Sequence, residues 1–319
     1  MSNAIEQLRS GLIVGHVGLG TYRGVPGNVG QEVHDGDTIR ARAIGDFGVR
    51  FLGVDAPEIS FTLPGEKTFT GLADPKWEAF LSDPFNPGLP RFKPALDPGL
   101  RAYLESHVGP GTALNHYRLA SAAEVALEQE VTADVAALGK TEETFQFLLF
   151  FSHEVMDRYG RMLAFINRFE PAKTETPRPL TYNERLLKTA LITPYFIWPN
   201  INPFRRQGSI TQAVIPPGKA NQIATKEKSL ADARRWIEDA RQNQIGIFDP
   251  NDPLRLLPFE LRFLSQRRPP ERWAIDLSKN DDLLIRPQNY YTIPNMEDRL
   301  FIPEEYVPLF VEAGWKRQE

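Results

Sequence analysis

Apolar side chains recur at four-residue spacing between Asn115 and Leu138, which is the spacing of one face of an α-helix. These apolar positions are Leu119, Ala123, Leu127, Val131 and Val135. Gly139 follows directly, and glycine is typical of the position just after a helix. The pattern therefore predicts a helix over residues 115–138.

Two further helices are predicted in the second half of the chain. Thr181 and Glu184 form a capping box, in which each side chain can satisfy the other residue's exposed backbone N–H, so a helix begins at Thr181. The third helix contains "SLADARRWIEDARQNQ", residues 229–244, and ends at Gly246. Its apolar stripe consists of Leu230, Ala233, Ile237 and Ala240.

The strands are predicted on both sides of the first helix. Residues 31–58 indicate a β-hairpin, because Thr38–Ile44 alternates, Gly45–Gly48 is a turn and Val49–Val54 returns. Two short apolar runs, Phe145–Phe151 and Met162–Phe169, are typical of buried strands.

Two segments show no sustained period. From Ser60 to Gly111 proline and glycine recur every few residues, so we expect a long irregular insertion that contributes little to the hydrophobic core. The chain after Pro250 is also rich in proline, with short apolar patches only.

Composition narrows the class of protein. The 319 residues are 41% hydrophobic, enough for a sizeable core, and the absence of cysteine excludes disulfides, thiolate metal sites and cysteine nucleophiles. The formal net charge of −4 argues against a protein held on nucleic acid by bulk electrostatics. No signal peptide and no run of about 20 apolar residues is visible, so we expect a soluble, cytoplasmic protein.

Formal charges gather in "HDGDTIRARAIGDFGVRFLGVDAPE", residues 34–58. Asp35, Asp37 and Asp55 would repel one another unless they surround a divalent cation, and hard oxygen ligands favour calcium or magnesium. A turn in which Asp35 bonds its own backbone explains part of the pattern equally simply. Arg50 lies on an apolar strand, where an arginine is usually paired or aimed at an anion. The residues alone thus leave open a metal–phosphate site and an internal Arg–Asp salt bridge.

Three motifs in order, "DGDT", "RFLGVDAPE" and "DRYGRMLAFI", resemble the staphylococcal nuclease (thermonuclease) family. The resemblance covers roughly residues 28–60 and 113–248. It implies an α+β fold with a five-stranded OB-type β-barrel and three packed helices. The corresponding domains are an N-terminal extension (1–27), a nuclease-like domain (28–248, with the insertion 60–112) and a C-terminal extension (249–319).

The resemblance also implies roles for individual residues. Asp37 and Asp55 match calcium ligands, together with the backbone carbonyl of Ala56, and Asp35 matches a supporting carboxylate. Glu58 is similar to the carboxylate that positions or deprotonates water. The two arginines that grip the phosphate correspond to Arg50 and Arg161.

The expected nucleotide contacts depart from the family pattern. Tyr159 is kept, but Arg158 replaces the usual lysine. Phe196 and Trp198 stand where a pair of tyrosines would flank the base, and core packing explains these two aromatic residues equally well.

The function that the resemblance implies is a calcium-dependent nuclease that hydrolyses DNA and RNA and leaves 3′-phosphate ends. The alternative is a non-catalytic module that binds nucleic acid or protein. A protein partner could dock on the insertion or on the C-terminal extension.

Overall fold

The computed structural model describes residues 3–8, 10, 12–22, 25–33, 38–170 and 179–319. The chain divides into two compact units. Unit 1 comprises residues 1–51 and 150–164, and unit 2 comprises residues 52–149 and 165–319. None of these divisions falls at residue 27 or 248, and the segments 60–112 and 249–319 both lie in unit 2.

Unit 1 is built from short strands. Its elements are β1 (Ile5–Gln7), β2 (Ile13–Gly15), β3 (Val17–Leu19), β4 (Thr21–Tyr22), β5 (Val25–Pro26), α1 (Val29–Glu32), β6 (Ala41–Ala43) and β7 (Val49–Phe51). The strands β1 and β2, β3 and β6, and β4 and β5 form two-stranded antiparallel pairs. A three-stranded sheet has the order β11–β12–β7, with β11 at Phe147–Met156 and β12 at Met162–Arg168.

The hairpin predicted over residues 31–58 is wrong. β6 pairs with β3, whereas β7 runs parallel to β12, so the two halves of the expected hairpin have different partners. Alternation indicates that a segment is extended but does not identify the strand beside it. The buried strands predicted at Phe145–Phe151 and Met162–Phe169 are confirmed as strands, although several side chains of β11 are exposed.

Unit 2 centres on a four-stranded sheet of order β14–β16–β13–β8. Its strands are β8 (Gly53–Asp55), β13 (Thr193–Ile197), β14 (Trp273–Asp276) and β16 (Arg299–Ile302). β13 is antiparallel to β8 and parallel to β16, and β16 is antiparallel to β14. The segment after residue 249 therefore supplies two strands to the sheet that contains Asp55.

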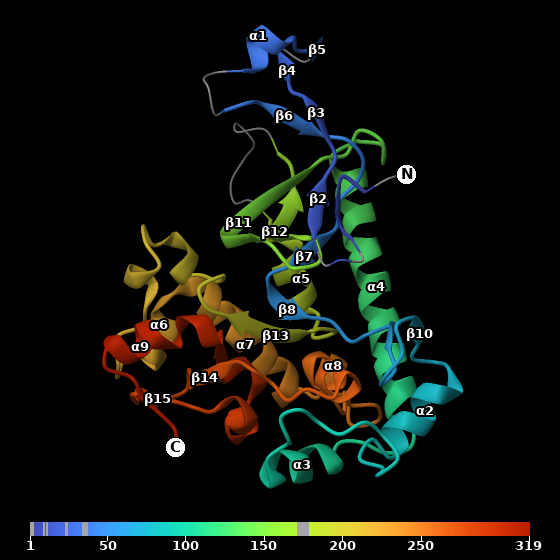
Figure 1. Ribbon diagram of the computed structural model, residues 1–319, viewed down its shortest axis with the longest axis vertical. Coiled ribbons are helices and arrows are strands. Elements are labelled where there is room, and N and C mark those ends of the chain that lie inside the picture. Colours follow the sequence, from blue (N-terminus) through green and yellow to red (C-terminus); the bar gives the residue numbers. More distant parts are fainter. Residues whose placement is uncertain (1–2, 9, 11, 23–24, 34–37, 171–178) are drawn as a thin grey trace. The chain divides into compact units, whose positions relative to one another are not determined.

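The three predicted helices are confirmed. They are α4 (Thr112–Ala137), α5 (Tyr182–Lys188) and α7 (Lys228–Gln242). Thr181 and Glu184 form the expected capping box, and all four residues of the predicted stripe on α7 are buried. In Figure 1 α4 is the long green helix, and α2 packs against it.

The segment 60–112 is not irregular. It contains β9 (Ser60–Thr62), β10 (Phe69–Gly71), α2 (Pro75–Ser82) and α3 (Pro98–Glu105). Trp77, Leu81, Leu100 and Leu104 are fully buried, in one apolar cluster with residues from the C-terminal segment. The expectation that this segment contributes little to the core is therefore wrong.

The remaining elements of unit 2 are mostly C-terminal. They are α6 (Ala220–Lys226), α8 (Pro258–Gln266), α9 (Val307–Glu312), β15 (Leu283–Leu284), β17 (Lys316–Arg317) and six 3-10 turns, at Phe204–Arg206, Thr211–Ala213, Gly246–Phe248, Pro287–Thr292, Met296–Asp298 and Glu304–Tyr306. The fold is thus mixed α+β with several small sheets, and its described strands do not close a five-stranded barrel. None of the helices in the described part of the chain has the length and apolar character needed to cross a membrane.

Candidate functional site

One guanidinium joins the two carboxylates of the D-A-P-E motif in unit 2. Arg262 donates to Asp55 through both terminal nitrogens, Nη2 to Oδ2 at 2.6 Å and Nη1 to Oδ1 at 3.0 Å. The same Nη1 donates to Glu58 Oε1 at 2.7 Å. Asp55 and Glu58 are therefore joined by an arginine from α8.

The position of Asp55 within the sheet explains why its side chain is buried. Asp55 ends β8 opposite Thr193 of β13, whose hydroxyl donates to the Asp55 carbonyl oxygen at 2.9 Å. The Asp55 side chain is 0% exposed, whereas those of Glu58 and Arg262 are each 23% exposed. A buried carboxylate is costly unless it is paired and hydrogen-bonded, and Arg262 supplies that pairing.

The charge of Arg262 is fixed by its partners. Burial alone would lower the pKa of Arg262, but the charges and hydrogen bonds of Asp55 and Glu58 outweigh burial and raise that pKa above its ordinary value. The guanidinium is therefore a permanent cation within the carboxylate pair.

His116 of α4 supports the turn that carries Glu58. The backbone N–H of Glu58 donates to His116 Nδ1 at 2.8 Å. Burial lowers the pKa of His116 to about 4, so the ring is neutral and its Nδ1 lone pair accepts this bond. His116 thus positions the Glu58 backbone and adds no charge.

The two arginines expected to grip the phosphate both belong to unit 1. β7 and β12 are parallel with Arg50 opposite Leu163, and the N–H of Met162 donates to the Gly48 carbonyl at 2.8 Å. Arg161 directly precedes Met162, so the register places Arg50 and Arg161 on one face of the sheet, a diagonal step apart.

Arg161 is held locally. Its Nε and Nη2 each donate to Asp157 Oδ2 at 2.7 Å. Asp157 Oδ1 accepts from the backbone N–H groups of Tyr159 and Arg161, which closes the turn, and Gly160 supplies its positive φ of 84°. The Arg161 side chain is 45% exposed, so a ligand in solution can reach it.

The two residues between Asp157 and Gly160 interact with each other. Arg158 donates to the Tyr159 hydroxyl at 2.8 Å, and its guanidinium lies 5.0 Å from the centre of that ring. Tyr159 is 47% exposed, which suits the nucleotide contact expected from the sequence.

Phe196 and Trp198, by contrast, lie in the core of unit 2. They are 4% and 0% exposed, and Trp198 Nε1 donates to the Ala213 carbonyl oxygen at 2.8 Å. The rings of Tyr306 and Phe310 pack edge-on against Trp198. Neither residue offers an open face for stacking on a base, so core packing is the interpretation that the structure supports.

The described residues do not fit a calcium site in this arrangement. Both carboxylate oxygens of Asp55, the expected ligand, face the Arg262 guanidinium, and a second cation at the same oxygens would be repelled. Asp35 and Asp37 lie outside the described residues. The described part of the chain has no cluster of three acidic or histidine side chains arranged to hold a metal ion. Ala56, whose carbonyl was the third expected ligand, directly follows Asp55.

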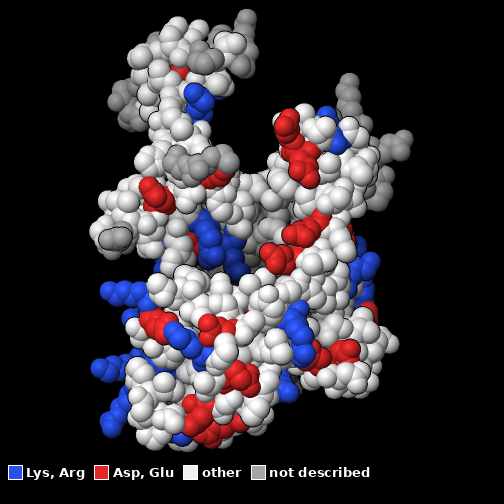
Figure 2. Space-filling model, turned by 90° about the vertical axis from the view of Figure 1, so that its right-hand side faces the viewer, with Lys and Arg blue, Asp and Glu red and all other residues white. Residues whose placement is uncertain are grey.

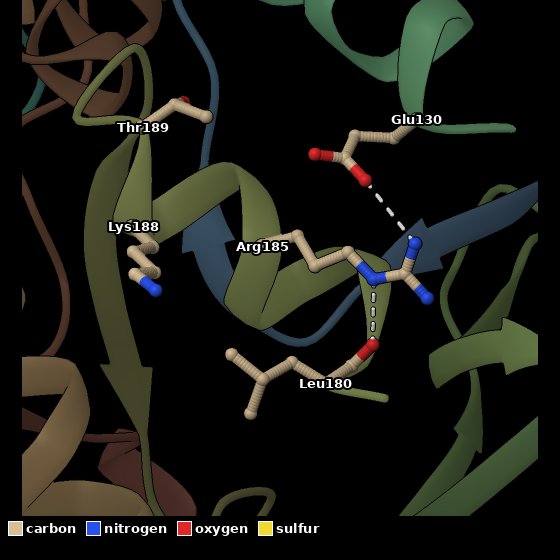
Figure 3. A pocket seen from close by; sticks show the side chains of 5 residues that line it. All are labelled: Glu130, Leu180, Arg185, Lys188 and Thr189. Atoms are coloured by element: carbon tan, nitrogen blue, oxygen red, sulfur yellow. Dashed lines mark hydrogen bonds and ion pairs between the residues drawn. The ribbon is translucent and has the colours of Figure 1, made fainter. Parts of the chain in front are cut away.

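Unit 2 also has a pocket of about 430 Å³ (Figure 3), and none of the residues expected in the active site lines it. Its lining residues are Glu130, Leu180, Arg185, Lys188 and Thr189. Arg185 donates to the Leu180 carbonyl oxygen and pairs with Glu130 and Asp134, so its charge is used within the fold.

The surface charge agrees with the acidic composition. Figure 2 shows basic and acidic side chains close to one another on the face in view. Several arginines of unit 2 pair with acids from other segments, such as Arg234 with Asp298 and Arg241 with Glu297.

Arg262 was not predicted from the sequence, although a signal for it exists. It stands between Leu261 and Phe263, in a segment that begins with Pro258. The argument that an arginine on an apolar stretch needs an anionic partner applies to Arg262 as it does to Arg50.

The comparisons with known proteins give one informative match. The chain is 24% identical over 310 residues to Endonuclease YhcR of Bacillus subtilis (strain 168), an alignment that covers 91% of this chain and 18% of that protein. The chain thus spans about a fifth of the length of the relative. No family model matches the chain, and no solved structure matches it.

Proposed function

We propose that this protein is a nuclease that hydrolyses the phosphodiester bonds of DNA and RNA. The observation that carries the proposal is the convergence of Asp55 and Glu58 on one guanidinium, which places two carboxylates of a nuclease-like motif together. The similarity to a bacterial endonuclease over most of the chain supports the same activity.

Glu58 is the proposed general base. Its side chain is 23% exposed, so water can reach it, and a carboxylate oxygen can accept a proton from that water. In the reaction the water oxygen bonds to phosphorus and one of its protons passes to Glu58. The P–O5′ bond breaks, the O5′ oxygen takes a proton from solvent, and a 3′-phosphate end remains.

Arg50 and Arg161 are the proposed phosphate ligands. Guanidinium groups bind phosphate oxygens through paired hydrogen bonds and stabilise negative charge that grows in the transition state. Arg161 is exposed and its turn is closed by Asp157, so its backbone is held while its side chain remains accessible. Tyr159 and Arg158 are proposed to contact the nucleotide.

Calcium dependence is a further part of the proposal, implied by the family resemblance. Calcium would supply positive charge that polarises the phosphate. Of the expected ligands, Asp55 and Ala56 lie within the described residues, and Asp55 is engaged by Arg262.

The test is a cleavage assay on plasmid and single-stranded DNA and on RNA, with calcium and then with excess chelator. We expect cleavage with calcium and none with chelator. The 3′ ends should resist polymerase extension until a phosphatase removes their phosphate groups. Glu58→Gln should abolish cleavage, whereas Glu124→Gln, at an exposed position of α4, is the matched control and should cleave normally.

The alternative, a non-catalytic binding module, makes a different forecast in the same assay. Such a module would retain single-stranded DNA in a binding experiment but cleave none under any metal condition. Glu58→Gln would then leave its behaviour unchanged.

A further inference from the structure

We propose that Arg272 is an anion-binding residue of unit 2, which takes a phosphate group of a single-stranded nucleic acid over the sheet face that carries Asp55. The inference rests on the proposed function in taking a nucleic acid strand as the ligand. Arg272 belongs to the C-terminal segment, so it adds a substrate-binding residue from outside the region that the family resemblance covers.

Tyr195 lies on the same face of the sheet as Asp55. β8 and β13 are antiparallel with Asp55 opposite Thr193, and Tyr195 comes two residues after Thr193. Paired residues share a face, and so do residues two apart on one strand, so the side chains of Asp55 and Tyr195 are diagonal neighbours. Burial lowers the pKa of Arg262, but nearby acidic groups, Tyr195 among them, raise it. The Tyr195 side chain therefore lies near the guanidinium that binds Asp55.

The Arg272 side chain lies over the same face. Arg272 directly precedes β14, whose Ala274 is opposite Phe301 of β16. Phe301 packs against the Tyr195 ring, with the ring centres 5.0 Å apart, so it shares the face of that ring. Arg272 stands two residues before Ala274 and points to the same side. Its Nη1 donates to the Tyr195 hydroxyl at 2.9 Å, and its Cζ lies 5.7 Å from the centre of that ring.

Arg272 has the capacity to bind an anion. An arginine carries five N–H donors, and the bond to Tyr195 uses one of its nitrogens. Among the described residues Arg272 forms no ion pair, whereas Arg262 pairs with Asp55 and Glu58. A phenol hydroxyl does not neutralise a guanidinium as a carboxylate does. The Arg272 side chain is also exposed, so its charge can be reached from solution.

The ring that holds Arg272 is fixed. Tyr195 is 9% exposed, and Phe259 of α8 stacks on it with the ring centres 5.3 Å apart. Phe259 and Arg262 stand three residues apart on α8, so one face of this helix contacts both Tyr195 and Asp55. The guanidinium of Arg272 is thus positioned by a rigid partner, and a preorganised group loses less freedom when it binds a ligand.

A phosphate group of a nucleic acid strand suits this position. A guanidinium forms paired hydrogen bonds with phosphate oxygens, and such charge-assisted bonds are stronger than those between neutral groups. A strand bound at Glu58 carries a phosphate at every nucleotide, so it offers further anions beside the one that is cleaved. Arg272 holds one of these neighbouring phosphates and takes no part in bond breaking.

The main test measures binding of a fluorescein-labelled single-stranded oligothymidylate by fluorescence anisotropy, in excess chelator, with gels to check that the strand stays intact. Arg272→Gln should bind about tenfold more weakly than the wild type at low salt, because a charge-assisted contact is lost. The slope of the logarithm of the binding constant against that of salt concentration should become shallower by about 0.7, the share of one phosphate in a single strand.

Arg268→Gln is the matched control, because Arg268 lies just beyond α8 and is exposed. It makes the same change of charge and should keep the wild-type affinity and salt slope. Tyr195→Phe keeps the ring but removes the hydroxyl that positions Arg272. Its affinity should fall less than that of Arg272→Gln, and its salt slope should stay that of the wild type, because the charge of Arg272 remains.

A second measurement guards against a variant that fails to fold. In the wild-type chain, the oligothymidylate should shift the NMR signal of the Arg272 guanidinium, which is assigned by its loss in Arg272→Lys. The signal of Arg268 should stay unchanged.

Equal affinities of the wild type and Arg272→Gln would overturn the inference, and so would an Arg272 signal that the strand leaves unchanged. An equal loss of affinity in Arg268→Gln would also overturn it, because any exposed arginine would then attract the strand. A chain that binds no oligothymidylate would overturn it as well. Because these measurements need no cleavage, a chain that binds the strand through Arg272 but cleaves nothing would contradict the proposed nuclease and leave this inference intact. A chain that cleaves normally while Arg272→Gln binds like the wild type would overturn this inference alone.

Discussion

Arg161 and Arg262 both pair with an aspartate, but in opposite settings. The Asp157–Arg161 pair lies four residues apart in the sequence, and Arg161 is 45% exposed. The Asp55–Arg262 pair spans 207 residues, and Asp55 is 0% exposed. A solvated pair of this kind contributes about 0–1 kcal/mol to stability, whereas breaking a buried pair costs about 3–5 kcal/mol. The exposed Arg161 is therefore available for a ligand, whereas Arg262, paired with the buried Asp55, is part of the fold.

The largest effect is expected for Arg262→Met, which removes the charge and keeps much of the side-chain volume. Asp55 would lose this counterion while staying in the sheet, so the free energy of unfolding should fall by about 3–5 kcal/mol in urea titrations. The double variant Asp55→Asn, Arg262→Met removes both charges and should recover part of the loss. If Arg262→Met were as stable as the wild type, the Asp55–Arg262 pair would contribute no more to stability than an exposed pair such as Asp157–Arg161.

A comparable effect should appear as acid sensitivity at His116. Its pKa is about 4 in the folded chain against an ordinary value of 6.5, so the unfolded chain takes up the proton first. Stability should fall as pH drops from about 6.5 to 4, by up to about 1.4 kcal/mol per pH unit and about 3 kcal/mol in total. His116→Asn keeps an acceptor for the Glu58 N–H but cannot titrate, and its stability should vary less with pH in this window. If the stability of the wild type and of His116→Asn varied identically with pH, His116 would not be the source of the acid sensitivity.

The exposed arginine should affect catalysis and spare folding. Arg161→Lys keeps the charge but loses paired hydrogen bonds to phosphate, so kcat should fall on the order of 10²-fold while substrate binding changes less. The free energy of unfolding should change by less than about 1 kcal/mol. Single-turnover rates and thermal melts on the same variant distinguish the two roles. A variant that melts early but cleaves normally would remove Arg161 from the proposed catalytic residues.

The smallest effect concerns salt. With a net charge of −4 and interspersed surface charges, few phosphates can be neutralised beyond the exposed arginines. The logarithm of the binding constant for single-stranded DNA should therefore fall only gently with the logarithm of salt concentration. A steep slope, equivalent to roughly eight or more phosphate contacts, would mean that further basic side chains bind the strand.

Local patterns in the sequence predicted local structure well. The helices α4, α5 and α7, the capping box at Thr181 and the stop at Gly139 follow from residues within a few positions of each other. The Asp157–Arg161 turn was not predicted, but it is equally local, because Asp157, Gly160 and Arg161 are near neighbours in the chain.

The density of proline in residues 60–112 and after residue 249 was interpreted as a lack of regular structure, and this interpretation is wrong. Pro75, Pro98 and Pro258 do not interrupt helices but begin α2, α3 and α8. At the first position of a helix the N–H that proline lacks is not needed, and its fixed φ suits the helix. A high density of proline thus marked the starts of short helices and not an irregular insertion.

The sheet and the carboxylate site depended on pairings that no short pattern encodes. β8 is completed by β13, β16 and β14, and Asp55 and Glu58 receive a guanidinium from α8. The family resemblance implied a calcium ligand at Asp55 and a water-positioning carboxylate at Glu58, but it could not indicate Arg262, which lies outside the region that the resemblance covers.

The separation of 207 residues between Asp55 and Arg262 has a consequence for synthesis on the ribosome. When Asp55 leaves the exit tunnel, neither its counterion nor the strands β14 and β16 have been made. The sheet around β8 can therefore form in full only after residue 302 has emerged. Pairings this distant in sequence slow folding, because a long loop must close before the contacts are gained. The segment that contains Asp55 and Glu58 is thus among the last parts of unit 2 to reach its final structure.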